Sequence, residues 1–557
     1  MSLQGVDQAV GQTSLFSEDA LGLMNLAQSA KWAAEYTRRD ISVSNISYLV
    51  QYGRIKRHGA NGSTLINRDE LKAYFDAANR EQDWKSKLGD DLNWRLSFDE
   101  YREKERTKHV HRLHPYKGKY IPQLVEYFLD DHTDEFKTKV YFKPGDIVLD
   151  PFSGSGTTLV QANELGIHAI GIDVSQFNCM ISNIKVEKHD TRSLAEALYD
   201  LTSKLGDFSK SRNRNIQQFD DELSSALNFA NFDESSSKLA KFNAENFPSP
   251  DYRRKVAQGI IEESSYAPQK EAVLLSEYHR LVEKHQVKIE QDTDGSFLDK
   301  WLLQPIRDEV DLILDEINGI KNPSIRNVMS LVLSRTVRSC RATTHADLGT
   351  LKEPVTTTYY CKKHGKMCKP LFTINNWWKR YAADTLNRLN EFSRLRTESM
   401  QHCVTGDSRS IDLTESLSKT NYHLADKVHN DKIKGIFSSP PYVGLIDYHE
   451  QHAYAYEMFR LERDDALEIG PLFNGQGLKA RHSYVTGVAN VLQNAKQYLQ
   501  PNYDVFLVAN DKYDLYPAIA EQAGMEIVNQ FKRPVLCRVE KDRSNAYSET
   551  IFHMKEC

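Results

Sequence analysis

The sequence predicts an α/β protein with a Rossmann-like sheet, a small N-terminal winged-helix domain and a large, mainly helical insertion. Three observations lead to this expectation. An apolar strand runs into a glycine-rich turn after residue 150, and a second strand ends in an acid about 20 residues later. Further strong apolar strands, such as 504–510 and 549–554, follow only after residue 400.

The glycine turn begins where the short apolar run 146–150 ends in an acid. Gly154 and Gly156 lack a Cβ atom, so the backbone can turn sharply and approach a ligand closely. Residues 157–166 have the apolar spacing of a helix, and 168–173 form the next strand, which ends in Asp173. An acid at this distance binds ribose hydroxyls in nucleotide-binding folds. Taken alone, the turn also fits any βαβ crossover.

A second motif, Ser439-Pro440-Pro441-Tyr442, follows the apolar strand end 434–437. Two consecutive prolines fix φ and remove two N–H donors, which leaves carbonyl oxygens free to accept hydrogen bonds from an amino group. Ser439 adds a side-chain acceptor, and Tyr442 offers a ring for stacking. The motif predicts a pocket that holds a flat base by its exocyclic amine; the alternative is a proline-stiffened turn.

Together, Asp150-Pro151-Phe152-Ser153-Gly154-Ser155-Gly156 and Ser439-Pro440-Pro441-Tyr442 resemble the two signature motifs of amino-directed DNA methyltransferases. The resemblance implies a methyltransferase sheet that uses S-adenosylmethionine and spans residues 100–186 and 400–557. Catalytic roles then fall to Ser439, Pro440, Pro441 and Tyr442. Cofactor contacts are implied for His114, Tyr116, Lys119, Asp150, Phe152, Ser153, Gly154, Gly156, Thr157, Asp173 and Asp407.

The serine of the second motif is most typical of cytosine N4 enzymes, whereas adenine N6 enzymes usually carry Asp or Asn there. The resemblance thus implies site-specific methylation of cytosine N4 in duplex DNA, by base flipping and direct attack of the amine. Many cytosine N4 enzymes place this motif before the glycine turn, and here the order is reversed. Methylation of adenine N6, or of guanine in RNA, stays open, as does a DNA-binding regulator with an inactive methyltransferase fold.

Several motifs that the chain lacks, together with its composition, exclude some classes of function. Methylation at carbon 5 of cytosine needs a cysteine nucleophile, usually in a Pro-Cys pair, and no such pair occurs in the chain of 557 residues. We expect no metal in the chemistry. Seven cysteines without a pairing framework, and no apolar run of membrane length, predict a cytoplasmic, nucleoid-associated protein that does not contact a membrane. The expected biology is restriction-modification with a cognate restriction endonuclease as partner, or regulation.

The N-terminal region predicts a DNA-binding module. After a flexible segment, 1–20, residues 21–80 contain two helices (27–38 and 43–52), a basic strand-turn-strand segment (54–66) and a third helix (67–77). This order resembles a winged helix-turn-helix of the excisionase type. It places Ser44, Asn45 and Ser47 on the groove-facing helix and Arg54, Lys56 and Arg57 on the wing. The alternative is an ordinary helical cap with a solvated basic turn.

Residues 187–399 form the insertion, for which we expect a role in target recognition. A helix at 324–341 carries Arg335, Arg338 and Arg341 at every third residue, on one side, which suits contact with phosphates. A helix that is salt-bridged to the catalytic domain is the alternative.

The insertion also contains a candidate for zinc binding. Cys361 and Cys368, with Cys340 and His345, could supply four ligands, but their spacing is unlike the usual knuckle. A basic hairpin with half-buried cysteines is the simpler interpretation, and no metal site is assigned from the sequence.

Overall fold

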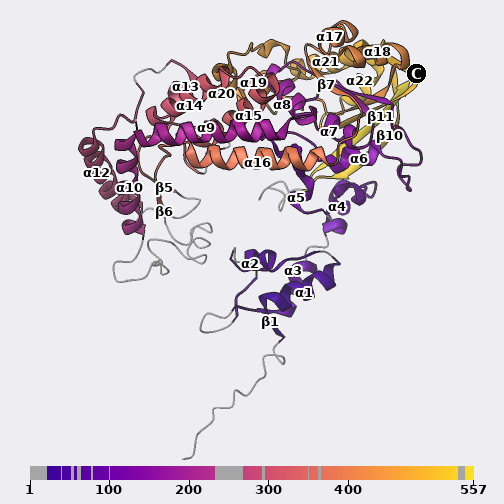
Figure 1. Ribbon diagram of the computed structural model, residues 1–557. Coiled ribbons are helices and arrows are strands. Elements are labelled where there is room, and N and C mark those ends of the chain that lie inside the picture. Colours follow the sequence, from indigo (N-terminus) through magenta and orange to yellow (C-terminus); the bar gives the residue numbers. More distant parts are fainter. Residues whose placement is uncertain are drawn as a thin grey trace, which may run out of the picture.

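The structure is a computed structural model (Figure 1). It describes residues 22–38, 40–51, 55–58, 64–76, 80–99, 101–211, 213–231, 267–291, 295–345, 347–348, 351–361, 366–536 and 546–557. The expected flexible segment 1–20 and the wing residue Arg54 lie outside these ranges.

A seven-stranded sheet forms the centre of the protein, in the order β10-β11-β9-β8-β3-β4-β7. Its strands are β3 (Ile147–Asp150), β4 (His168–Asp173), β7 (Gln401–Thr405), β8 (Ile433–Ser438), β9 (Leu499–Ala509), β10 (Met525–Pro534) and β11 (Ser548–Glu556). The first five in chain order run parallel, and β11 lies antiparallel between β9 and β10. The predicted α/β class with a mostly parallel sheet is confirmed.

Helices cover both faces of this sheet because its central strands are apolar on both sides. In β3, Val148 packs into one core, and Ile147 and Leu149 pack into the other. The first core is covered by α6 (Pro122–Leu129), α7 (Thr157–Glu164) and α8 (Gln176–Val186). The second is covered by α17 (Leu413–Thr420), α18 (Tyr422–Asp431), α21 (Leu478–Lys496) and α22 (Tyr516–Ala523).

The insertion lies between β4 and β7 in the chain. It comprises α9 (Thr191–Ser211), α10 (Arg214–Asn231), α12 (Ala267–His285), α13 (Phe297–Trp301), α14 (Gln304–Asn318), α15 (Pro323–Cys340), the hairpin β5 (Tyr359–Cys361) and β6 (Lys366–Cys368), and α16 (Asn375–Ser393). The long helices α9 and α16 lie side by side and extend away from the sheet, to its left in Figure 1. Leu331 of α15 and Trp378 of α16 belong to the same core as Leu159 of α7, so the insertion shares its core with the sheet.

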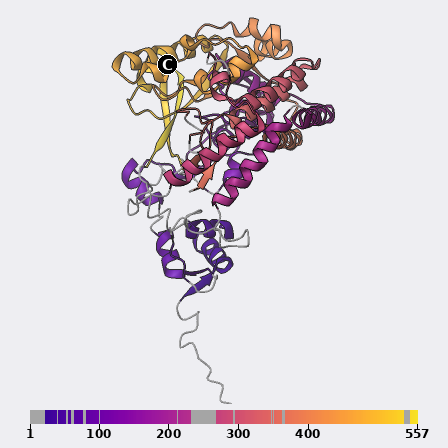
Figure 2. The ribbon, with the colours of Figure 1, turned by 90° about the vertical axis from the view of Figure 1, so that its left-hand side faces the viewer.

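The N-terminal unit contains β1 (Leu23–Asn25), α1 (Leu26–Thr37), α2 (Val43–Gln51), β2 (Leu65–Asn67) and α3 (Arg68–Asp76). It has a core of its own, which includes Ala33, Ile46 and Leu71. β1 pairs antiparallel with β2, and His58 forms a further bridge with Leu65. Figure 2 shows this unit standing apart from the sheet and its helices. The strand β1 was not predicted from the sequence.

A connecting segment joins this unit to the sheet through α4 (Arg80–Leu88), η2 (Trp94–Ser97), α5 (Glu103–Arg106) and η3 (His109–Arg112). It docks on the outer strand β10, where the Asn93 amide donates to the Lys532 carbonyl at 2.7 Å.

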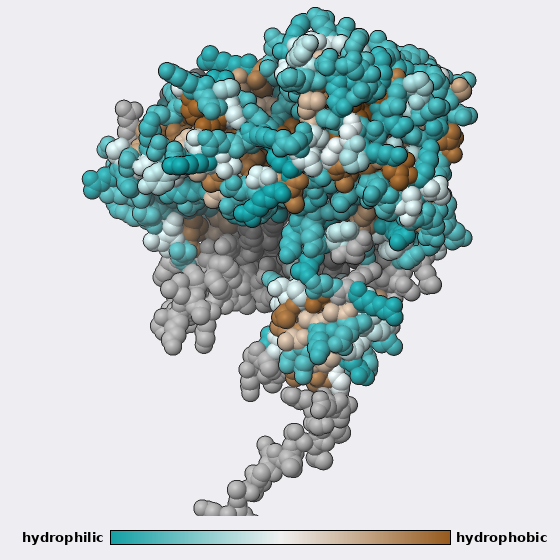
Figure 3. Space-filling model, turned by 45° about the vertical axis from the view of Figure 1, so that its right-hand side comes forward, coloured by the Kyte–Doolittle hydropathy of each residue, from teal (hydrophilic) through white to brown (hydrophobic). Residues whose placement is uncertain are grey.

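After β8, the chain forms α19 (Tyr448–Gln451), α20 (Ala453–Phe459), η5 (Asp465–Leu467) and η6 (Leu472–Asn474). Figure 3 shows a mainly hydrophilic face, and no helix among the described residues is long and apolar enough to span a membrane.

Candidate active site

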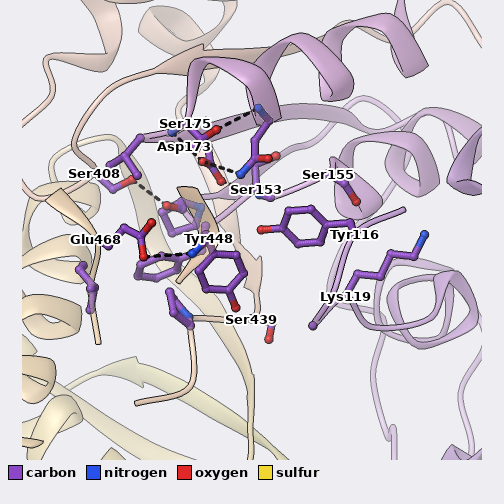
Figure 4. A pocket seen from close by; sticks show the side chains of 18 of the residues that line it. Tyr116, Lys119, Ser153, Ser155, Asp173, Ser175, Ser408, Ser439, Tyr448 and Glu468 are labelled. Carbon is purple, nitrogen blue, oxygen red and sulfur yellow. Dashed lines mark hydrogen bonds between the residues drawn. The ribbon is translucent and has the colours of Figure 1, made fainter. Parts of the chain in front are cut away.

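A pocket opens at the carboxyl ends of the parallel strands β3, β4, β7 and β8, where such folds bind ligands. It is lined by Tyr116, Gly118, Lys119, Tyr120, Pro151, Phe152, Ser153, Gly154, Ser155, Thr157, Asp173, Val174, Ser175, Asn178, Asp407, Ser408, Ser439, Pro441, Tyr448, His449, Leu467, Glu468 and Ile469. Figure 4 shows Asp173 and Ser175 on one side and Ser439 on the other, with Tyr116 and Tyr448 between them. The two motifs found in the sequence therefore meet in one pocket.

The glycine turn has a backbone that a side chain would disturb. Gly154 and Gly156 both have positive φ, 51° and 73°, which an L side chain rarely adopts. A Cβ on Gly154 would lie 2.9 Å from the Tyr116 hydroxyl, and a Cβ on Gly156 would lie 2.9 Å from the Ser182 Cβ. The Ser155 and Thr157 hydroxyls at this turn are buried without a hydrogen-bond partner in the described structure. The turn thus presents polar atoms to a ligand.

Asp173 ends β4 and faces the same space. Its carboxylate accepts hydrogen bonds from the backbone amides of Gly154 (2.8 Å) and Ser175 (2.9 Å), and from the Asn178 side chain (3.1 Å). Burial raises the pKa of Asp173 to about 6, and these hydrogen bonds oppose the rise. The side chain is thus held in place by the glycine turn, and an oxygen with two lone pairs can accept a further donor.

The loop after β7 closes the next side of the pocket. Arg409 binds the Asp407 carboxylate through Nε, at 2.8 Å and 3.0 Å from its two oxygens. The Ser408 hydroxyl donates to the Pro151 carbonyl at 2.7 Å and so ties this loop to the glycine turn. Asp407 thus lines the pocket, and the Arg409 guanidinium partly neutralises its carboxylate.

Two neighbouring serines at the end of β8 differ in their surroundings. Ser439 lines the pocket, whereas Ser438 is buried and donates to Asp150 at 2.5 Å. The Tyr120 hydroxyl donates to the other oxygen of Asp150 at 3.1 Å and also contacts Thr158. Burial raises the pKa of Asp150. Asp150 therefore does not line the pocket; it joins the glycine turn to the start of the Ser-Pro-Pro-Tyr segment.

Tyr442 lies behind the pocket wall and is not among its lining residues. Its hydroxyl donates to Glu549 of β11 at 2.7 Å, and Arg533 of β10 pairs with the other oxygen of Glu549 at 3.3 Å. Arg533 also donates to the Leu96 carbonyl at 3.1 Å. The end of the Ser-Pro-Pro-Tyr segment is thus anchored to the antiparallel edge of the sheet.

Aromatic rings form the boundary between this pocket and a second hollow. The ring of Tyr116 stacks against those of Tyr448 and His452, with centroids 5.9 Å and 6.1 Å apart.

Glu468 accepts hydrogen bonds from the backbone amide of His449 at 2.7 Å and from that of Tyr448 at 3.2 Å. Its carboxylate also contacts the His449 Nδ1 at 2.5 Å. Glu468 therefore fixes the start of α19 against the pocket.

The second hollow, the arginine cavity, has a volume of about 880 Å³. Tyr116 and Lys119 line both spaces, so the two adjoin. The basic side chains at the arginine cavity are Arg112, Lys117, Lys119, Arg335, Arg338, Arg341, Arg380 and Arg388, with Asp384, Asp447 and Glu450 as the acids. Burial lowers the pKa of His452, another lining residue, to about 3, so this ring adds no charge at neutral pH.

The three arginines predicted on one side of the helix 324–341 all line this cavity, with different partners; α15 ends at Cys340, so Arg341 lies just beyond the helix. Arg335 is 6% exposed and pairs with Asp384 at 2.6 Å. Arg341 donates to the carbonyls of Arg338 and Leu348, at 2.9 Å and 2.8 Å. Within the described ranges, neither Arg338 nor Arg341 forms an ion pair with a carboxylate. Arg335 is thus neutralised by an acid of the fold. Arg341, at 9% exposed, is also buried, but no carboxylate in the described ranges neutralises it or Arg338.

Several predicted cofactor residues lie elsewhere. His114 does not line the pocket: its ring faces α15, where Nε2 contacts the Ser334 hydroxyl at 3.0 Å, and it borders the arginine cavity. Gly156, predicted to contact the cofactor, and Pro440, predicted to be catalytic, are also absent from the lining of the pocket. Roles for Ser438, Tyr120, Glu468 and Glu549 were not predicted from the sequence. Ser438 and Tyr120 carried a signal, because each lies beside a predicted residue, Ser439 and Lys119.

In the N-terminal unit, Ser44, Asn45 and Ser47 are exposed on α2. Asn45 is partly used by the helix itself, because its side chain accepts from the Ser42 amide at 2.8 Å and from the Ser42 hydroxyl at 2.6 Å. Lys56 and Arg57 are exposed beside the bridge between His58 and Leu65.

Comparisons with known proteins point to one family. The model of the N6/N4 methyltransferase family, described as DNA methylase, matches residues 44–183. Over 546 residues the chain is 43% identical to the Type II methyltransferase M.MjaII of Methanocaldococcus jannaschii, which covers 97% of this chain and 98% of that protein. It is also 34% identical to the Type II methyltransferase M.MvaI of Kocuria varians over 116 residues, 21% of this chain and 24% of that protein.

Proposed function

Because the chain belongs to the family of amino-directed DNA methyltransferases, we propose that it methylates the N4 amine of cytosine in duplex DNA, with S-adenosylmethionine as donor. The observation that carries this proposal is the meeting of Ser439 and Asp173 in one pocket. Ser439 supplies a hydrogen-bond acceptor for the exocyclic amine of the base, and Asp173 supplies an acceptor for the ribose hydroxyls of a nucleoside.

The residues of the pocket fit the cofactor that methyltransferases of this family use. Asp173 would accept hydrogen bonds from ribose hydroxyls, and Asp407 would lie beside the adenine. The buried Ser155 and Thr157 hydroxyls, which have no partner in the described structure, would find donors or acceptors on the ligand. When bound, S-adenosylmethionine supplies an electrophilic sulfonium methyl group.

The catalytic segment orients the target amine. The Ser439 hydroxyl and the Pro440 carbonyl accept hydrogen bonds from the two amine protons, so the nitrogen lone pair points toward the methyl group. The lone pair would form the new C–N bond as the bond between the methyl carbon and the sulfonium sulfur breaks, which leaves the thioether S-adenosylhomocysteine, and a proton would then pass from the nitrogen to solvent. Most of the rate comes from this orientation in a site shielded from water. Tyr442 supports the segment through Glu549.

The arginine cavity supports a flipped base as the substrate. An amine inside a duplex cannot reach the pocket, so the target nucleotide must leave the stack. The cavity adjoins the pocket at Tyr116 and Lys119, and Arg338 and Arg341 face it without carboxylate partners in the described ranges. Their charge suits the phosphates that flank the extruded nucleotide.

We assign the N-terminal unit a role as a winged helix that binds the same duplex. Exposed Ser44 and Ser47 on α2 suit the major groove, and Lys56 and Arg57 suit the backbone. Both relatives are Type II methyltransferases by name, which supports a restriction-modification setting, with an endonuclease that recognises the same DNA site as partner.

The decisive experiment identifies the methylated base. The purified chain is incubated with S-adenosylmethionine and mixed-sequence duplex DNA, and the DNA is digested to nucleosides for mass spectrometry. We expect N4-methylcytosine, lost in Ser439→Ala and retained in Ser418→Ala, whose serine is exposed on α17. N6-methyladenine would overturn the base assignment. Cofactor binding without any methylated nucleoside would favour an inactive regulator.

A further inference from the structure

One cluster of soft ligands in the insertion lies outside the proposed active site. His345, Cys361 and Cys368 each place one ligand atom within 4.8 Å of the other two. Cys340, the fourth residue considered from the sequence, packs into the main core and does not join this group. We propose that His345, Cys361 and Cys368 bind a structural zinc ion. This proposal does not depend on the methylation activity.

The hairpin brings the two cysteines to one face. β5 and β6 pair antiparallel, with Tyr359 opposite Cys368 and Cys361 opposite Lys366. Side chains alternate along a strand, so Cys361 lies on the same face as Tyr359, and Cys368 lies diagonally across from Cys361. Both cysteines are buried, at 1% and 8% exposed. A diagonal pair on one face has the right arrangement to hold a single ion.

The distance between two of the three ligand atoms is close to that expected for a tetrahedral zinc ion. Bonds of about 2.3 Å to sulfur and about 2.0 Å to nitrogen place those two ligands about 3.5 Å apart. The Cys361 Sγ lies 3.8 Å from the His345 Nδ1. The Tyr359 hydroxyl lies 2.9 Å from the same nitrogen. With zinc on this nitrogen, we expect the hydroxyl to turn and donate to a thiolate.

Ligand chemistry separates this cluster from the two others in the described structure. Two thiols and an imidazole favour zinc over hard cations. The group of His109, His111 and Glu164 is already engaged, since Lys108 pairs with Glu164 at 2.7 Å. The group of His449, Asp465 and Glu468 belongs to the candidate active site, where Arg463 neutralises Asp465 at 2.7 Å.

The location explains what a metal would do for the fold. Each strand of the hairpin has three residues. Met367, on one face, packs into the main core, whereas the apolar cluster on the other face contains only Tyr359, Cys361, Cys368 and the partly buried Val355 among the described residues. A hairpin of this size is marginally stable by itself. Zinc would tie it to His345, just after α15. Leu348 and Leu351, in the segment between, line the arginine cavity, so the ion would hold one wall of that cavity.

Metal analysis of the full chain, purified without a metal-affinity tag and dialysed, tests the site. We expect roughly one zinc ion per chain. Cys361→Ser and Cys368→Ser should lose the zinc ion. Loss of a residue that only supports a metal ligand lowers zinc affinity about 10–100-fold, and we expect the loss of a ligand itself to lower it further. Cys557→Ser, at an exposed cysteine, and Cys340→Ala should keep the zinc ion.

A cobalt titration of the wild-type chain, stripped of metal, gives an answer even if the serine variants fold poorly. We expect the absorption of thiolate-bound tetrahedral cobalt, displaced by added zinc. Three results would overturn the proposal: zinc at equal levels in the wild type and both serine variants, a cobalt spectrum without thiolate bands, or a disulfide between Cys361 and Cys368.

Discussion

Ser438 and Ser439 are adjacent, yet we expect their removal to have different consequences. The side chain of Ser439 reaches the pocket, so Ser439→Ala should lower kcat by about 100-fold or more, a typical cost of losing one preorganised polar contact at a reacting group. Affinities for S-adenosylmethionine and DNA should stay within about twofold of the wild type. Single-turnover methylation, with separate binding titrations, measures both. A loss confined to DNA affinity would contradict the role assigned to Ser439.

Ser438→Ala acts on the fold instead. The substitution removes the donor at 2.5 Å from the buried Asp150 carboxylate and leaves Tyr120 as its side-chain partner at 3.1 Å. A buried acceptor that loses a donor costs about 1–3 kcal/mol. We expect the free energy of unfolding to fall by this amount in urea titrations, whereas Ser418→Ala should leave it unchanged.

Asp173 makes cofactor binding depend on pH. Its pKa of about 6 lies above the ordinary value because of burial, and the charged carboxylate accepts a hydrogen bond from a ribose hydroxyl more strongly than the neutral acid does. The dissociation constant for S-adenosylmethionine should therefore rise as pH falls through 6. A raised carboxyl pKa means that folding takes up a proton, so this group favours the folded state at low pH and loses that contribution as pH rises from about 4 to 6. Weaker binding at acid pH thus does not reflect unfolding at this site.

Calorimetric titrations between pH 5 and pH 8 measure this dependence. Asp173→Asn should bind weakly at every pH, with a flat profile. Asp426→Asn, an exposed change on α18, should follow the wild type. An unchanged profile in Asp173→Asn would assign the pH dependence to another group.

At the scale of elements, we expect the arginines on and just after α15 to have two different roles, DNA binding and stabilisation of the fold. Arg338→Ala and Arg341→Ala should each weaken DNA binding and reduce the slope of log affinity against log salt by about 0.9, because each removes one phosphate contact. Arg335→Ala should instead destabilise the fold by about 1–3 kcal/mol, since it leaves the Asp384 carboxylate with Arg388 alone. Fluorescence anisotropy over a range of salt, together with thermal unfolding, separates the two effects. Equal salt slopes in all three variants would contradict this division.

Elements with strong local patterns could be predicted from the sequence. The strand 168–173 matches β4, and the helix 324–341 differs from α15 by one residue at each end. β1 was missed because its three residues gain their structure from pairing with β2. Asn45 was assigned to the groove, yet it also caps its own helix, a local use that competes with recognition.

At the scale of the whole molecule, the pocket needed contacts that no local pattern contains. Ser438 and Asp150 are 288 residues apart in the chain, and Tyr442 and Glu549 are 107 apart. The motifs predicted which residues carry the chemistry. They did not predict that Asp150 would support the pocket from behind or that His114 would face α15, because both follow from packing between distant elements.

The two proposed DNA contacts, the wing and the arginine cavity, belong to one chain, so each raises the effective concentration of DNA at the other. The double variant Lys56→Ala/Arg57→Ala removes two exposed charges from the N-terminal unit while the pocket stays intact. We expect the affinity for any duplex to fall and the salt slope to decrease by about 1.8. At saturating DNA, kcat and the preferred sequence should be unchanged, since phosphate contacts position the protein without reading bases. Methylation kinetics over a range of DNA concentrations measure both quantities, with Lys419→Ala, an exposed change on α17, as the matched control. A lower kcat at saturation would mean that the N-terminal unit acts on the chemistry, and an unchanged affinity would remove it from the DNA interface.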